Sequence, residues 1–218
     1  MRLQIVEDKP PLAPVANLHN EPDRGYSDVR VCTWDRAGLF SKMAGALSAV
    51  GLNILSAQIF TRTDGVALDK FFVTDAFTGK LATVEQREQF ERVLTEVLAD
   101  DKVNLTALIA RQRISHPLYQ AYMGERIPTQ IRVDNDASET RTLIEIETED
   151  RIGLLYTISQ TLTELELDIS SAKINTEQGA AIDSFYVRDV DGGKILAAER
   201  HLAIERKLRQ AIGELDRR

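Results

Sequence analysis

Two short segments of this chain have the composition of a turn that can bind a small anion. They share the pattern Asp-Arg-x-Gly-Leu and consist of Asp35, Arg36, Ala37, Gly38 and Leu39 and, 115 residues later, of Asp150, Arg151, Ile152, Gly153 and Leu154. Each segment precedes apolar residues at helical spacing, so each predicts a strand-to-helix turn. The start of a helix has unpaired N–H groups and a partial positive charge, which suit a carboxylate. A glycine there lets a ligand approach the backbone.

A polar side chain follows each predicted helix. Asn53 has both a donor and an acceptor, so it can pair with an α-amino group, an α-carboxylate or a side-chain amide. The equivalent residue is Asp168, which follows Glu166. Extra negative charge there opposes a carboxylate, although Asp168 can favour an ammonium group. We therefore expect the better site to combine the first turn, residues 36–39, with Asn53.

The same residues also have simpler structural interpretations. Asp35 and Asp150 are good helix caps, which is the favoured role for their carboxylates and does not exclude a nearby ligand. Gly38 and Gly153 can ease close packing of a helix on a sheet. Asn53 can satisfy its own turn.

Two further acidic residues lie on predicted strands. Asp69 and Asp183 alternate with Phe71 and Phe185 and can line a groove, although a solvated strand face is the favoured interpretation. For Arg36 and Arg151, beside the two turns, an exposed ion pair is favoured over anion steering.

The turns belong to a repeat that covers most of the chain. Its members are a strand (28–34, 142–149), a helix after each turn, two strands (52–61 with 66–74, 168–176 with 180–188) and a second helix (83–98, 197–215). Strand–helix–strand–strand–helix is most of a ferredoxin-like βαββαβ unit, so the fold class is α+β. The last strand is missing from both repeats. Extended segments at 14–18 and 129–133 are predicted to be leading strands that replace it.

The repeat predicts four parts of the chain. These are an N-terminal tail (1–12), a first domain (13–99), a linker (100–128) and a second domain (129–218). Within the linker, Asn104 can cap a short helix that ends at His116-Pro117.

In this order the motifs resemble the ACT domain, a small-molecule-sensing module. The match rests on Asp-Arg-x-Gly-Leu, a helix, Gly-Leu-Asn-Ile, and a hairpin with Asp-Gly and Leu-Asp-x-Phe. The tandem is similar, over roughly residues 13–215, to the C-terminal ACT–ACT region of the PII uridylyltransferase/uridylyl-removing enzymes (GlnD). The usual proline of the turn is replaced by Ala37 and Ile152. The resemblance implies an amino-acid ligand, with glutamine favoured.

Composition and motifs exclude several classes of function. A net charge of −7 argues against nucleic acid and anionic membrane surfaces as partners. The single cysteine, Cys32, and the lack of a signal or membrane segment predict a cytoplasmic protein. The three histidines are isolated, and the sequence has no P-loop and no His-x-x-x-His, Cys-x-x-Cys or Gly-x-Ser-x-Gly pattern. We therefore expect no catalytic residue, no metal and no cofactor.

The sequence thus favours a non-catalytic regulatory sensor of nitrogen or amino-acid metabolism. Its expected partners are an amino acid, a regulated protein, and further chains through ACT–ACT contacts. The two domains are expected to pair side by side or through their helices, with ligand at their interface. Two alternatives stay open: an adaptor built on an ACT pair that binds no metabolite, and a sensor fragment of a PII uridylyltransferase.

Overall fold

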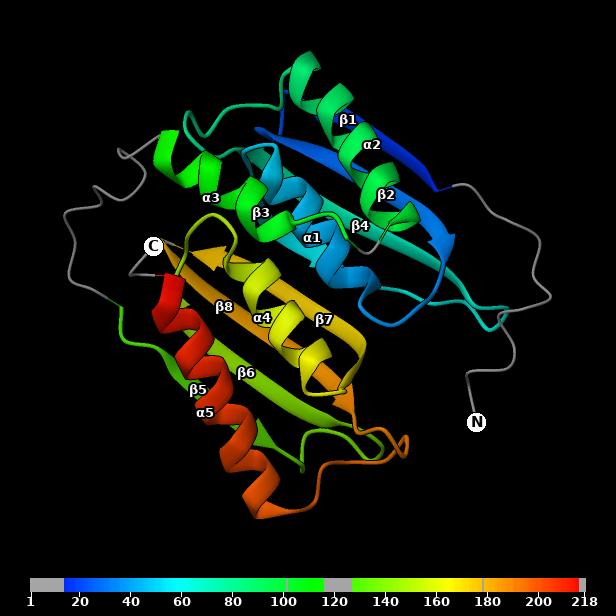
Figure 1. The fold of residues 1–218 in the computed structure, drawn as a ribbon, viewed down its shortest axis with the longest axis vertical. Coiled ribbons are helices and arrows are strands. Elements are labelled where there is room, and N and C mark those ends of the chain that lie inside the picture. The colour runs from blue at the N-terminus through cyan, green and yellow to red at the C-terminus, as the bar shows by residue number, and fades with distance from the viewer. Residues whose placement is uncertain (1–13, 101, 116–126, 178, 216–218) are drawn as a thin grey trace.

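The computed structural model describes residues 14–100, 102–115, 127–177 and 179–215. These residues form one eight-stranded sheet with five helices packed on one of its faces (Figure 1). The strand order is β1-β2-β4-β3-β7-β8-β6-β5, and the pairings are antiparallel.

The two repeats contain corresponding elements. The first repeat comprises β1 (Val15–Glu21), β2 (Tyr26–Trp34), α1 (Leu39–Ala49), β3 (Leu52–Gln58), β4 (Val66–Asp75) and α2 (Val84–Ala99). The second comprises β5 (Gln130–Asp134), β6 (Thr142–Glu149), α4 (Leu154–Glu164), β7 (Asp168–Glu177), β8 (Ala180–Arg188) and α5 (Ala198–Leu215). Between them lies α3 (Leu105–Ser115), where the Ala107 N–H donates to Asn104 Oδ1 at 3.0 Å. The tail 1–12 and His116-Pro117 lie outside the described residues.

The leading strands take the place of the missing last strands, as predicted. β1 pairs with β2 in a register that sets Val15 opposite Cys32, and β5 pairs with β6 with Gln130 opposite Glu147. The fold class is therefore confirmed as α+β, with two ferredoxin-like units. One strand is shorter than predicted, since β3 ends at Gln58 and Thr61 forms an isolated bridge with Ala67.

The repeats join edge to edge through β3 and β7. Gln58 pairs with Lys173, and these two residues occupy equivalent positions in the repeats. An approximate two-fold axis therefore passes beside this pair. The axis also sets α1 antiparallel to α4, so that the repeats pair both side by side and through their helices (Figure 1).

The core lies between the sheet and the helices. Its largest fully buried side chains include Phe71 and Phe185 from β4 and β8, Phe90 from α2 and Met43 from α1. At α2, a capping box satisfies the first turn: Gln86 N donates to Thr83 Oγ1 at 3.2 Å and Thr83 N to Gln86 Oε1 at 3.0 Å. None of the helices in the described part of the chain is long and apolar enough to cross a membrane.

Candidate functional site

Asn53 does not lie beside the turn of its own repeat. Helix α1 has 11 residues between the turn 35–39 and β3, a length of about 16 Å at about 1.5 Å per residue. Asn53 follows the C-terminal end of this helix, whereas the turn precedes its N-terminal end. The predicted pairing of turn 36–39 with Asn53 is therefore wrong.

Each turn instead meets the other repeat. Asn53 Nδ2 donates to Asp150 Oδ2 of the second turn at 3.1 Å. At the first turn, a Cβ added to Gly38 would lie 3.3 Å from Cγ2 of Thr163, near the end of α4. The two-fold relation that brings Asn53 to the second turn also brings its equivalent, Asp168, to the first. Both candidate sites are therefore composite, with a turn from one repeat and a strand start from the other.

The first turn is open to solvent. Asp35, Arg36 and Ala37 are exposed, while Leu39 is buried and anchors the start of α1. Next to it, the Ser41 hydroxyl lies 2.8 Å from the Gly38 carbonyl oxygen. We call residues 35–39 the open turn.

The second turn is covered by the linker helix. Ile152, Gly153 and Leu154 are buried, and a Cβ on Gly153 would approach Ile109 Cγ2 of α3 to 2.7 Å. Helix α3 is itself held on α1 by Gln112 Nε2, which donates to the Ala49 carbonyl at 2.9 Å. We call residues 150–154 the covered turn. Sequence reasoning predicted a helix in this linker, but not that it packs on one of the two sites.

The turn aspartates do not cap the helices. Gly38 and Gly153 occupy the N-cap positions with φ of 72° and 83°, and neither helix start has a side-chain cap bond. Their left-handed conformation is what requires glycine. Helix capping by Asp35 and Asp150 is therefore wrong, and so is the idea that Asn53 satisfies its own turn, because its amide bonds to Asp150.

The predicted solvated face for Asp69 and Asp183 is also wrong, because both side chains are buried. Burial raises the pKa of Asp69 to about 7, a hydrogen bond from the Phe60 N–H opposes this rise, and Asp35 adds to it. Burial and the charge of Asp150 raise the pKa of Asp183 to about 8. The buried Oδ1 of Asp183 has no hydrogen-bond partner among the described residues. Each turn aspartate thus lies near a buried carboxyl of its own repeat.

Glu166 has a backbone conformation that is rare for its residue type. Its φ is 60°, and it is the non-glycine residue with positive φ in the described part of the chain. The equivalent residue in the first repeat is Gly51, with φ of 75°. A β-carbon costs about 1–2 kcal/mol in this region, and strain of this kind is concentrated at functional sites. Glu166 lies two residues before Asp168, on the side of the second repeat that faces the open turn.

Both turns bring polar groups together. The polar groups that gather there are backbone N–H groups, carboxylates and amides, which suit a zwitterion. Among the described residues, no group of three or more His, Cys, Asp or Glu side chains has a geometry that suits a metal ion.

Comparison with known proteins gives a match to a model of an ACT-like domain and matches to bifunctional uridylyltransferase/uridylyl-removing enzymes. A family model described as "ACR9-like, ACT-like domain" matches residues 130–215. The bifunctional uridylyltransferase/uridylyl-removing enzyme of Rhodospirillum rubrum is 38% identical over 192 residues, which is 88% of this chain and 20% of that enzyme. The enzyme of Azospirillum brasilense is 37% identical over 219 residues, 96% of this chain and 22% of its own length.

A third such enzyme and one solved structure also match this chain. The enzyme of the same name from Cereibacter sphaeroides is 37% identical over 180 residues, 83% of this chain and 19% of that enzyme. A crystal structure of aspartate kinase from Synechocystis aligns with 87% of this chain and 27% of that chain, at a TM-score of 0.44 and 15% identity, which is too low to indicate shared function. The chain thus spans about a fifth of the length of the curated relatives it matches.

Proposed function

The chain is a tandem ACT-domain protein that resembles the C-terminal ACT–ACT region of the uridylyltransferase/uridylyl-removing enzymes, and from this premise we propose that it is a non-catalytic regulatory module that senses an amino acid. The ligand binds between the open turn of the first repeat and the strand start of the second. The observation that carries this assignment is the contrast between two equivalent turns, one exposed and one buried beneath α3.

The open turn offers complementary groups for both charges of a free amino acid. The N–H groups at the start of α1 carry partial positive charge, so they suit the α-carboxylate. Asp35 and Asp168 come from opposite sides of the site and suit the α-ammonium group. In this arrangement the Asp168 carboxylate favours binding because it faces the ammonium group of the ligand. The negative charge of Asp168 therefore does not argue against a site at the open turn.

Glutamine is the ligand we favour. Polar side chains surround the open turn, where Ser41 Oγ lies 3.4 Å from Oε1 of Gln160 and the Thr163 side chain faces Gly38. Hydroxyl and amide groups can pair with the donor and the acceptor of a side-chain amide. The resemblance to enzymes of the uridylyltransferase family points in the same direction.

The covered turn holds no ligand in this proposal. Ile109 occupies the approach to Gly153, and Asp150 accepts a hydrogen bond from Asn53. The second site has therefore become part of the interface between the repeats, and the chain binds one amino acid.

The regulated activity lies outside these two domains. The relatives are named for adding and removing uridylyl groups, and this chain spans about a fifth of their length. We propose that amino-acid binding at the interface of the repeats controls an activity of that kind, located in attached domains or in a partner protein, within nitrogen metabolism.

Calorimetric titration of the chain with L-glutamine tests the proposal. We expect one site per chain, weaker binding of D-glutamine, and weaker binding by Asp35→Ala than by the matched variant Asp150→Ala at the covered turn. No heat of binding at millimolar L-glutamine, with the chain folded by circular dichroism, would reject glutamine as the ligand. A full screen of amino acids without any binding would favour the adaptor function instead.

A further inference from the structure

Two helices, one from each repeat, meet beside the open turn. Helices α1 and α4 are antiparallel, so the start of α1 lies next to the end of α4 (Figure 1). A Cβ added to Gly38 would lie 3.3 Å from Thr163 Cγ2, and Ser41 Oγ lies 3.4 Å from Gln160 Oε1. Ser41 belongs to the first turn of α1. The Gln160 amide therefore lies within the length of one side chain of the N–H groups that suit an α-carboxylate.

Packing of the two helices does not require this polar pair. The approximate two-fold axis relates Ser41 to Tyr156 and Gln160 to Gly45. At the equivalent crossing, a Cβ added to Gly45 would lie 2.8 Å from Cδ2 of Tyr156, and the Tyr156 hydroxyl lies 3.3 Å from Thr106 Oγ1 of α3. An aromatic ring thus fills the crossing near the covered turn, whereas a hydroxyl and an amide occupy the crossing near the open turn.

Glu164 sets the orientation of the Gln160 amide. Gln160 Nε2 lies 3.4 Å from Glu164 Oε1, one turn further along α4. A carboxylate accepts hydrogen bonds and does not donate them, so it attracts the NH2 group of the amide and repels the carbonyl oxygen. Oε1 is therefore held on the side of Ser41 and the open turn.

The Gln160 amide retains hydrogen-bonding capacity on that side. The Ser41 hydroxyl has one proton and lies 2.8 Å from the Gly38 carbonyl oxygen but 3.4 Å from Gln160 Oε1, so the Gly38 carbonyl takes the proton. Within the described part of the chain, no other donor reaches Oε1. Nε2 has a second N–H besides the one that faces Glu164. The amide thus offers a ligand one acceptor and one donor.

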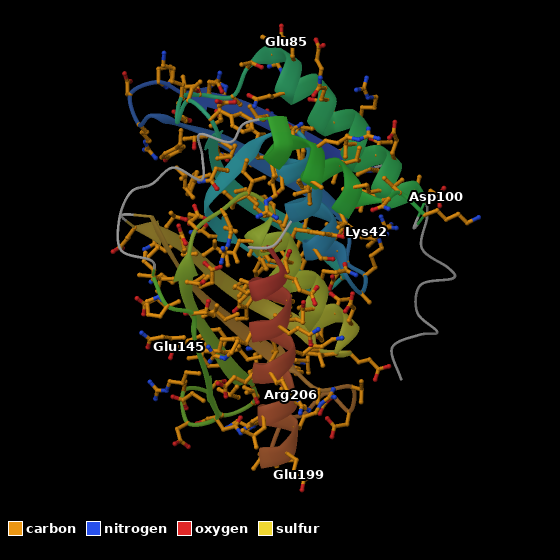
Figure 2. The ribbon with its side chains drawn as sticks, turned by 60° about the vertical axis from the view of Figure 1, so that its left-hand side comes forward. Lys42, Glu85, Asp100, Glu145, Glu199 and Arg206 are labelled. Atoms are coloured by element: carbon orange, nitrogen blue, oxygen red, sulfur yellow. The ribbon has the colours of Figure 1, made fainter. Side chains whose placement is uncertain are left out.

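We propose that Gln160 binds the side chain of the ligand and selects a side-chain amide over a carboxylate, a role that rests on the amino-acid site proposed above. A glutamine side chain can donate to Oε1 and accept from Nε2. A glutamate side chain is ionised at neutral pH and has acceptors only, so its oxygen meets Oε1 with no proton between them. Charge alone does not make this choice, because Arg36 of the open turn and Lys42 of α1 (Figure 2) can both attract a carboxylate.

Calorimetric titration with L-glutamine, L-glutamate and L-methionine tests this role. The parent chain should bind glutamine at least about tenfold more tightly than glutamate, since a site that pairs with an N–H group discriminates against a ligand without one. Gln160→Leu removes the amide at similar size. It should weaken glutamine binding at least about tenfold and change methionine binding little. Gln160→Lys replaces the acceptor with donors, so the preference for glutamine over glutamate should fall at least about tenfold.

The matched control is Gln210→Leu. Gln210 Nε2 also donates to a glutamate one turn away, Glu214 Oε1 at 3.0 Å. It lies on α5, the helix that carries Arg206 in Figure 2, and α5 packs on the opposite side of α4 from α1 (Figure 1). This variant should bind all three ligands as the parent chain does.

The outcomes separate this role from the proposed function. A parent chain that binds no glutamine rejects glutamine as the ligand, and the role of Gln160 with it. A parent chain that binds glutamine, with Gln160 variants that are folded by circular dichroism and keep its preference, overturns the role of Gln160 alone. Equal weakening of all three ligands by Gln160→Leu also overturns it, because a purely structural residue has that effect.

Discussion

Asn53 Nδ2 donates a hydrogen bond to Asp150 Oδ2 at 3.1 Å, across the interface between the two repeats. The bond joins a strand start of the first repeat to a turn of the second. It also removes Asn53 from the turn of its own repeat, which makes each candidate site a product of both repeats. Any ligand that moves one repeat against the other must therefore change the geometry of both turns.

Asn53→Ala and Asp168→Ala should have opposite phenotypes. Loss of the Asn53 amide leaves the partly buried Asp150 carboxylate with fewer donors, so unfolding by urea should show a loss of about 1–3 kcal/mol. Affinity for glutamine should change little. Asp168→Ala should mainly weaken glutamine binding, by at least about tenfold, since hydrogen bonds to charged groups contribute about 1.5–3 kcal/mol. Binding that depends on Asn53 more than on Asp168 would place the ligand at the covered turn.

Glu166→Gly should stabilise the protein. A φ of 60° is strained for glutamate and normal for glycine, and the equivalent Gly51 adopts 75°. The expected gain in the free energy of unfolding is about 1 kcal/mol, measured by urea denaturation. If Glu166 is kept for function, the same variant should bind glutamine more weakly. Gly51→Ala is the matched control and should destabilise the chain, while a gain in stability for both variants would contradict the strain argument.

The alternation of residues along this strand already indicated that Asp69 is buried. Positions 69, 71 and 73 share one strand face, and Phe71 and Val73 belong to the core. The solvated interpretation was wrong because it gave charge more weight than strand period. The leading strands were predictable for a similar reason, since a unit without its last strand leaves a position beside β2 that a preceding extended segment can fill.

The contacts between the repeats could not be predicted in this way. Periodicity shows which face of a strand is buried, but not which edge strands pair, so it did not show that β3 joins β7. The Asn53–Asp150 bond depends on that junction. The position of Ile109 against Gly153 depends in addition on the path of the linker, where the sequence predicts a helix but no packing partner.

Stability should fall as pH rises because of the two buried carboxyls. The pKa values of Asp69 and Asp183 are raised from 3.8 to about 7 and about 8, so the folded state retains protons that the unfolded state has lost. Their contribution is therefore fully present below about pH 4 and is lost as pH rises to about 8.

The variant Asp183→Asn separates this effect from other titrations. The variant should make stability decline less between pH 4 and 8. It should also raise the free energy of unfolding at pH 8 by at least about 1 kcal/mol, because one pKa unit corresponds to about 1.36 kcal/mol. Urea unfolding at several pH values measures both. A parallel decline in parent and variant would show that Asp183 is ionised in the folded protein.

Gly153→Ala should destabilise the chain more than Gly38→Ala. Both residues have positive φ, so each substitution should cost about 1–2 kcal/mol through the backbone alone. At Gly153 the new Cβ also meets Ile109 at 2.7 Å, whereas at Gly38 the nearest atom is 3.3 Å away on the flexible Thr163 side chain. The additional loss in the free energy of unfolding at Gly153 therefore measures the contact with α3. The substitution Ile109→Ala should remove this additional loss.

A double-mutant cycle measures that contact directly. The loss for Gly153→Ala should be smaller in the Ile109→Ala background than in the parent chain, by about 1–3 kcal/mol, the usual cost of overpacking. The matched pair Gly38→Ala with Ile109→Ala should be additive, because Ile109 is not among the neighbours of Gly38 within 4 Å. Additivity in both cycles would mean that α3 does not cover the second turn in solution. Both turns would then be open, and calorimetry should find two amino-acid sites per chain instead of one.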